Sequence, residues 1–261
     1  MRLRSITLFI SFSIFILLVN DARSQSYNIV SFEGERTNII LSHNKFSGLL
    51  SISCLKDTFY NNDFLRTEQV RILDKHFLMV VYDKRAGSNE DLMNLILLCT
   101  NAGRIYQAFH GQYFSRIYAN DHFNSGSESW NSSNRNEFYK LAIILSGNDQ
   151  NNYKLSVNIY DRKSLDKNSK SRYSNKEHVI LHFDKNHKIF SNGTKQLKGN
   201  YSVFDPRLGK EVKRYYSITC PIIILGTYTY CYIEGEWYVI SNDDKLYKYT
   251  YCSLPQKNDV N

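Results

Sequence analysis

Apolar and polar residues alternate with a period of two near the C-terminus of the chain. The segments 228–233 and 245–251 carry a tyrosine at every second position, and a short apolar run, 222–225, precedes them. The pair Glu234-Gly235 follows the first tyrosine segment and is a good two-residue turn. β-Branched and aromatic residues at this period, interrupted by Gly, Asn and Asp, are typical of antiparallel strands joined in sequence. The pattern therefore predicts an antiparallel meander.

The same pattern extends over most of the preceding chain. Strand-like segments flank turn candidates at 33–35 and 74–76, and the mostly apolar run 92–99 predicts a central strand buried on both faces. No segment keeps a helical period over several turns. We therefore expect an all-β protein of about a dozen strands, an antiparallel meander that forms a sandwich or a barrel. Internal echoes, such as 95–98 with 141–144, leave propeller-like blades as the alternative.

Three segments are too polar, or too irregular in period, to predict strands. Residues 57–67 mix polar and aromatic residues, and residues 110–135 are rich in Asn, Ser and aromatic residues. Residues 161–176 contain Lys, Ser, Asn and Arg with almost no apolar side chain. We expect all three to be surface loops, the last of them solvated.

The N-terminus has the three-part pattern of a secretory signal peptide. Two arginines precede an apolar run of 14 residues, 6–19, and residues 20–24 then offer a small-x-small cleavage site after Ser24. That run is shorter than the roughly 20 residues of a membrane-spanning helix. We therefore expect a signal peptide over 1–24, cleaved near Ser24, and a secreted or periplasmic protein without a transmembrane segment. A single all-β domain over 25–254 and a short polar tail over 255–261 complete the predicted organisation.

Positive charge is concentrated in one part of the chain. Residues 161–214 hold 14 Lys and Arg against six Asp and Glu, whereas the formal net charge of the whole chain is +8. Such a surplus favours anionic partners. Behind a signal peptide these are an anionic glycan, a lipid headgroup or an envelope protein, and nucleic acid is disfavoured; the alternative is a solvated face without a ligand. The candidate anion-binding residues are Lys185, Lys188, Lys195, Lys198, Arg207, Lys213 and Arg214.

Aromatic residues form the second candidate surface, because exposed rings can stack on sugar faces. The candidate ligand-stacking residues are Tyr228, Tyr230, Tyr232, Trp237, Tyr247 and Tyr249. The alternative, which we prefer, is that these rings form core contacts and cross-strand pairs. Such pairs stabilise a sheet by ~0.2–1 kcal/mol each.

Cysteine usage leaves room for a disulfide. The five cysteines are Cys54, Cys99, Cys220, Cys231 and Cys252. An exported protein can form disulfides, and an odd number leaves at least one thiol without a partner in the same chain. A turn at 226–227 would place Cys231 opposite Ile222, one diagonal step from Cys220. Cys220 and Cys231 are therefore the first candidates for a bridge, with small buried thiols as the alternative.

Catalytic motifs are not evident in this sequence. It contains no nucleophile elbow, zinc-protease motif, C-x-x-C pair or glycine-rich phosphate loop. Among the histidines His178, His182 and His187, the first two lie about 13 Å apart on a regular strand, too far for one metal ion. We expect the acidic pairs in turns to be solvated; these are Glu33/Glu35, Glu234/Glu236 and Asp243/Asp244. We therefore assign no catalytic residue and expect no metal and no cofactor.

Together these patterns favour a secreted, non-enzymatic binding or scaffold protein of the cell envelope or exterior. The alternative is a secreted hydrolase acting on polysaccharide or peptide, because β-rich hydrolases can assemble carboxylates from distant strands. A deep cleft lined by two or three carboxylates would favour the hydrolase. A flat aromatic or basic face would favour the binding protein.

Overall fold

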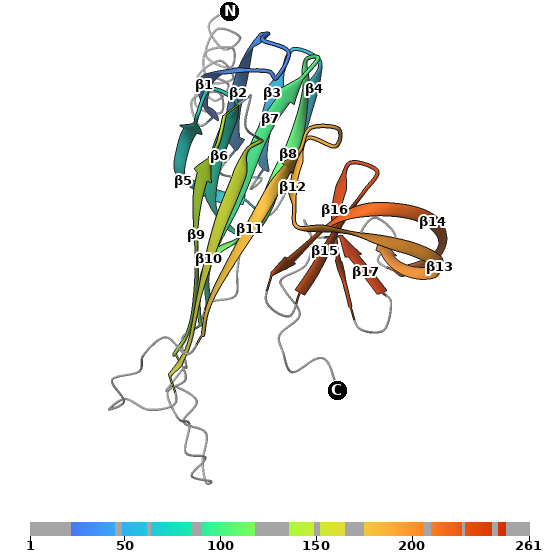
Figure 1. The fold of residues 1–261 in the computed structure, drawn as a ribbon. Helices are drawn as coiled ribbons and strands as arrows, with labels where there is room; N and C mark the ends of the chain where they lie inside the picture. The colour runs from blue at the N-terminus through green and yellow to red at the C-terminus, as the bar shows by residue number, and fades with distance from the viewer. Residues whose placement is uncertain are drawn as a thin grey trace, which may run out of the picture.

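The protein is an all-β molecule of three sheets (Figure 1). The computed structural model describes residues 22–44, 49–61, 64–84, 90–117, 136–148, 152–164, 175–205, 210–225, 228–241 and 245–248. These residues form 17 strands, so the all-β class is confirmed. The specific arrangement we expected, about a dozen strands in one sandwich, barrel or set of blades, is not found. The strands instead divide into a four-stranded sheet, an eight-stranded sheet and a small closed barrel.

The first sheet is an antiparallel meander in chain order. Its strands are β1 (Ala22–Val30), β2 (Arg36–Asn44), β3 (Leu49–Cys54) and β4 (Asp57–Asn61). The hairpin predicted around 33–35 is confirmed, with Gly34 at φ 89° in the turn. The loop predicted at 57–67 is wrong, because β4 pairs with β3 and the next strand begins at Phe64. The weak period of this segment is explained by β4, which buries only its last residue fully, Asn61.

The eight-stranded sheet also follows the chain, but it folds over on itself. Its strands are β5 (Phe64–Leu73), β6 (Phe77–Lys84), β7 (Glu90–Asn101), β8 (Arg104–Ile117), β9 (Asn136–Ser146), β10 (Lys154–Ser164), β11 (Asn175–Asp184) and β12 (Ile189–Ser191). β8 and β9 pair only over the last four residues of β8. Phe77 on β6 lies 5.3 Å from Phe183 on β11, ring centre to ring centre. Strands so far apart in the ladder meet because the β9–β12 half packs over the β5–β8 half.

The β5–β8 half is the middle layer, covered on both faces. On β7, Leu95 and Leu97 belong to the core shared with the β9–β12 half, whereas Ile96 and Leu98 face the four-stranded sheet. All four side chains are fully buried. The central strand predicted at 92–99 is therefore confirmed, and burial on both faces explains its continuous apolar sequence.

The barrel comprises the last five strands. They are β13 (Gly193–Asp205), β14 (Lys210–Leu225), β15 (Tyr228–Ile233), β16 (Glu236–Ile240) and β17 (Lys245–Lys248). The meander predicted from the tyrosine pattern is present, and its Glu234-Gly235 turn is confirmed by φ values of 51° and 89°. Closure comes from a parallel pairing of β17 with β13, in which Ser202 lies opposite Lys245. Nothing local in the sequence predicts that pairing.

The barrel packs against the eight-stranded sheet through part of its outer surface. Outward side chains of β14, β15 and β16 join the core of that sheet; they are Ile223, Leu225, Tyr230, Tyr232, Trp237 and Val239. The indole of Trp237 donates a hydrogen bond to the Gln107 carbonyl of β8 at 3.2 Å. The Asn192 side chain donates to the Ile224 carbonyl and accepts from the Ile224 amide, at 3.1 and 2.9 Å. Sheet and barrel thus share one core, while the division of the chain into domains stays a prediction.

Two further loop predictions need correction at their edges. Residues 110–117 belong to β8, so the loop predicted at 110–135 cannot begin before 118. β10 continues to Ser164 and β11 starts at Asn175, which shortens the predicted loop 161–176 from both ends. The remainders of both loops lie outside the described residues, as do most of the predicted signal peptide and the C-terminal tail.

Nothing in the part of the chain that the structure describes forms a helix long and apolar enough to cross a membrane.

Candidate functional site

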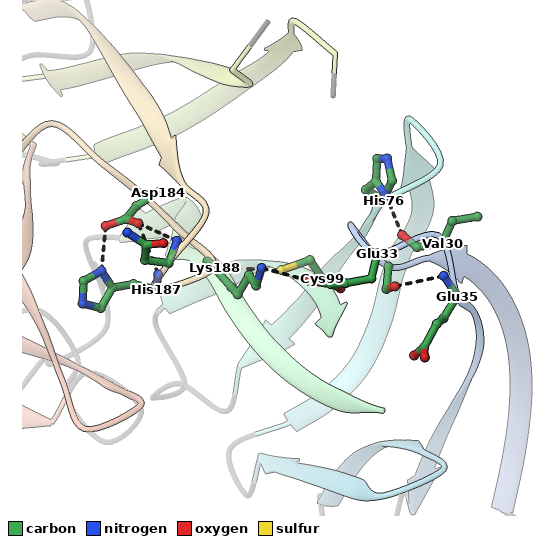
Figure 2. A network of polar contacts seen from close by, with 10 residues as sticks. Val30, Glu33, Glu35, His76, Cys99, Asp184, His187 and Lys188 are labelled. Carbon is green, nitrogen blue, oxygen red and sulfur yellow. Dashed lines mark hydrogen bonds and ion pairs between the residues drawn. The ribbon is translucent and has the colours of Figure 1, made fainter. Parts of the chain in front are cut away.

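Three turns meet in a network of polar contacts (Figure 2), to which ring stacking adds aromatic contacts. Lys188, after β11, lies with its Nζ 3.5 Å from Glu33 Oε1 and 5.5 Å from the centre of the Phe32 ring. Phe32 stacks on His76 at 4.7 Å and on Phe183 at 4.8 Å between ring centres. These contacts fasten the β1–β2 turn to the β5–β6 turn and to the end of β11. We call Phe32, Glu33, His76, Phe183 and Lys188 the clamp.

The contacts around the clamp are also structural. His76 Nδ1 lies 2.6 Å from the Val30 carbonyl, and the Cys99 thiol donates to the Lys188 carbonyl at 3.6 Å. Burial raises the pKa of Cys99, so this thiol stays protonated and unreactive. Burial opposes ionisation of Asp184, but hydrogen bonds from the ring and backbone of His187 outweigh it and lower the pKa of Asp184. These contacts hold the turns together, and we assign the network no chemistry.

The three histidines considered for a metal do not come together. His187 pairs with Asp184 at 2.6 Å, and His182 is exposed on β11. His178 Nε2 lies 2.6 Å from Ser156 Oγ on the neighbouring strand. Within the described ranges, no three His, Cys, Asp or Glu residues are grouped closely enough to hold a metal ion.

The Ser156–His178 contact resembles the nucleophile and base of a hydrolase. Sequence analysis missed it, because it depends on the pairing register of β10 with β11, where Asn158 lies opposite His178. Both side chains lie on the solvent-facing side of these strands. Within the described part of the chain, no carboxylate contacts the His178 ring to orient it, so the third member of a catalytic triad is missing. The contact therefore carries no catalytic assignment.

A hollow of about 480 Å³ lies between the end of β5 and the end of β9. Its lining residues are Arg71, Ile72, Leu73, Asp74, Ile143, Ile144, Leu145, Gly147 and Tyr153. The Tyr153 hydroxyl donates a hydrogen bond to the carboxylate of Asp74, the one acidic side chain in this lining. The hollow thus differs from the cleft with two or three carboxylates that the hydrolase interpretation requires.

The seven candidate anion-binding residues fall into several environments. Lys185 is exposed in the β11–β12 turn, and Lys188 is held in the clamp with its side chain 12% exposed. Lys195 is half-buried on the inward side of β13. Arg214 is exposed but lies beside Tyr216, whose hydroxyl it contacts. Arg207 lies outside the described residues. Of the seven candidates, Lys198 and Lys213 therefore remain as exposed residues that can share one outer surface.

Lys198 and Lys213 flank an exposed tyrosine on the outer face of the β13–β14 ladder. Tyr215 is 65% exposed, slightly more than Tyr60 at 60%. It lies opposite Asn200, while Lys213 precedes it by two residues on the same face and Lys198 is one diagonal step away. Ser202 and Ser217 complete the surroundings. We call Lys198, Asn200, Ser202, Lys213, Tyr215 and Ser217 the β13–β14 face.

The geometry of the β13–β14 face combines an open ring, two cations and small hydrogen-bonding groups. Outward positions of an antiparallel pair lie about 4.5–8 Å apart, so a single extended ligand can contact several of them. Lys198 and Lys213 have no carboxylate partner among the described residues, whereas neighbouring Glu211 pairs with Lys245 at 3.6 Å. In Figure 1 the far ends of β13 and β14 project away from the two larger sheets. The face is therefore accessible.

The candidate stacking residues are placed differently from Tyr215. Tyr230, Tyr232 and Trp237 are 6%, 9% and 5% exposed and lie between the barrel and the eight-stranded sheet. Tyr228 and Tyr247 are partly buried against the same core, and Tyr249 lies outside the described residues. The ring that the structure leaves open, Tyr215, was not among the candidates. Its signal was present in the sequence as a tyrosine directly after the basic segment 161–214, two residues after Lys213.

Comparison of the chain with protein-family models, curated proteins and solved structures gave no match.

Proposed function

We propose that this is a secreted, non-enzymatic binding protein whose β13–β14 face takes an anionic glycan. The observation that carries the proposal is Tyr215, an open ring flanked by Lys198 and Lys213 on a projecting hairpin. A tyrosine presents a large rigid surface at low entropic cost. Ammonium groups form charge-assisted hydrogen bonds to carboxylate or sulfate oxygens.

Both chemical features are needed to favour a glycan over other anions. A lipid headgroup would use the two lysines, but it would gain little from an exposed aromatic ring beside them. Asn200, Ser202 and Ser217 add donors and acceptors suited to sugar hydroxyls. The ring and these small polar groups together support a sugar chain with anionic substituents.

The test is binding of the mature protein to heparin, a sulfated polysaccharide, at several salt concentrations. Tyr215→Ala should weaken binding about tenfold, since truncation of an aromatic residue central to an interface costs more than about 1 kcal/mol and about 1.4 kcal/mol corresponds to tenfold. The double variant Lys198→Glu/Lys213→Glu should weaken it about tenfold or more and should flatten the salt dependence. The matched control is Lys140→Glu/Lys154→Glu, which makes the same change in charge at exposed positions of β9 and β10.

The outcomes separate the alternatives. Equal losses in the two double variants would show that only net charge matters, and that result would refute the proposal. Binding to vesicles of anionic lipid that is insensitive to Tyr215→Ala, without binding to heparin, would replace the glycan by a headgroup. A hydrolase is not proposed, because the Ser156–His178 contact lacks an orienting carboxylate in the described structure.

A further inference from the structure

Two thiols meet inside the barrel. Cys220 on β14 and Cys231 on β15 are 2% and 0% exposed and belong to the barrel's interior cluster. Ile222 lies directly opposite Cys231, so the predicted register of these strands is confirmed and Cys220 is one diagonal step from Cys231. The two thiols are joined by a hydrogen bond. Diagonal neighbours on one face of an antiparallel pair lie about 7–8 Å apart between Cα atoms, slightly beyond the usual disulfide range of about 4.4–6.8 Å, so a bridge requires the two strands to move closer together at this point.

The two sulfur atoms are not equivalent. The hydrogen bond with Cys231 lowers the pKa of Cys220 against the effect of burial, and the nearby charge of Lys195 helps. The same hydrogen bond, together with burial, raises the pKa of Cys231. Cys220 is therefore the thiol that ionises first, and a thiolate is the nucleophile in disulfide exchange.

The other described cysteines lack such a partner. The Cys54 thiol donates to the Gly103 carbonyl at 2.9 Å, and the Cys99 thiol donates to the Lys188 carbonyl. Neither has a second sulfur among its described contacts. The pairing of Cys220 with Cys231 is thus specific within the described residues, and Cys54 provides a control.

We propose that Cys220 and Cys231 form a reversible disulfide that ties β14 to β15, with a small-molecule disulfide as the oxidant. The Cys220 thiolate attacks one sulfur of the external disulfide, breaks its S–S bond and releases a thiolate that takes up a proton. Cys231 then loses its proton, attacks the Cys220 sulfur of the mixed disulfide and displaces the second external thiolate. Two protein thiols become one disulfide, and the oxidant is reduced to two thiols.

Burial sets the kinetics of this exchange. Both sulfur atoms are covered by the barrel interior, so the oxidant reaches them only when β14 and β15 open locally. The bridge would join the two barrel strands whose outward side chains Ile223, Tyr230 and Tyr232 pack on the eight-stranded sheet. The inference is independent of the proposed glycan binding, since the β13–β14 face lies on the outer side of the barrel.

The test uses the full protein, fully reduced and then exposed to oxidised glutathione under native conditions. Remaining thiols are alkylated, and the digest is analysed by mass spectrometry without reduction. We expect a cross-linked pair of peptides containing Cys220 and Cys231, lighter by two hydrogens than the separate peptides, and its loss on reduction. Cys54→Ser should keep this cross-link, whereas Cys231→Ser should abolish it and leave Cys220 as a glutathione adduct or a free thiol.

Two results would overturn the inference. One is alkylation of both Cys220 and Cys231 after oxidation of the folded wild-type protein. The other is a cross-link from either residue to Cys54, Cys99 or Cys252 as the main product. Because both outcomes are read on the wild-type chain, the inference is tested even if a serine variant does not fold.

Discussion

Replacing His110 with Gln is predicted to remove most of the sensitivity of folding to mild acid. His110 lies on β8 and is 4% exposed, beneath the four-stranded sheet. Its Nε2 lies 3.4 Å from Tyr82 Oη, which accepts a hydrogen bond from Asn61 at 2.8 Å. Burial, aided by the positive charge of Lys84, lowers the pKa of His110 to about 3. The folded protein thus keeps this imidazole neutral where an unfolded chain would protonate it.

The sign and size of the effect follow from linkage. The pKa of a histidine in an unfolded chain is about 6.5. Below that pH the imidazole of residue 110 is protonated in the unfolded chain but stays neutral in the folded protein. Stability is complete above the unfolded pKa and falls as the pH drops toward the folded pKa. Between pH 7.5 and pH 5 the loss is about 2 kcal/mol, and it approaches about 1.4 kcal/mol per pH unit below that. The loss at pH 5 hardly depends on the exact folded pKa, provided that it is below about 4.

The assay is urea denaturation at pH 7.5, 6 and 5 for the wild type, His110→Gln and a control, His182→Gln. The variant His110→Gln will lose some stability at every pH, but the difference between pH values should shrink by about 2 kcal/mol. His182 is exposed, so its variant should keep the wild-type difference. The lowered pKa of Asp184 acts only below the ordinary carboxyl range, outside this window. An unchanged pH dependence in His110→Gln would refute the reasoning.

Three further predictions test other parts of the molecule. Trp237→Ala should destabilise the protein by about 3–5 kcal/mol, whereas Trp237→Phe should cost much less, as measured by denaturation, because packing outweighs the hydrogen bond to Gln107. In the clamp, Phe32→Ala should cost about 3 kcal/mol. Glu33→Gln should cost less than about 1 kcal/mol, because Glu33 is half exposed and its ion pair is weak. Mass spectrometry of the exported protein should show an N-terminus near Gln25.

Local features of the fold could be predicted from the sequence because they depend on neighbouring residues. The turn at Glu234-Gly235 uses backbone angles that glycine adopts without strain. The register that places Cys231 opposite Ile222 could be predicted by counting residues across a single turn. By contrast, the pairing of Ser202 with Lys245, which closes the barrel, joins segments more than 40 residues apart in sequence and has no local signature. The packing of Phe77 on Phe183 is equally remote along the chain.

The candidate site was found only in part, because exposure depends on what covers a sheet. Tyr215 and Tyr230 both occupy outward positions of barrel strands, and period alone does not distinguish them. One is 65% exposed and the other is 6% exposed, because the eight-stranded sheet covers the second and not the first. The same limit applies to Lys188, whose counter-charge Glu33 is supplied by a turn more than 150 positions earlier. Charge and aromatic content identified the part of the sequence that holds the candidate site, but they did not identify the β13–β14 face.

β14 shows where the sequence did carry this information. Its outward positions run from Lys213, Tyr215, Ser217 and Thr219, all exposed, to Pro221, Ile223 and Leu225, all buried. The backbone period does not change along the strand, but the outward residues change from polar to apolar between Thr219 and Pro221. An alternating first half predicts one covered face, and the apolar run at 222–225 predicts two, although Ile224 in that run stays 45% exposed. The sequence of β14 therefore indicates where this strand starts to pack against the eight-stranded sheet. The β13–β14 face lies on the part of the strand before that apolar run.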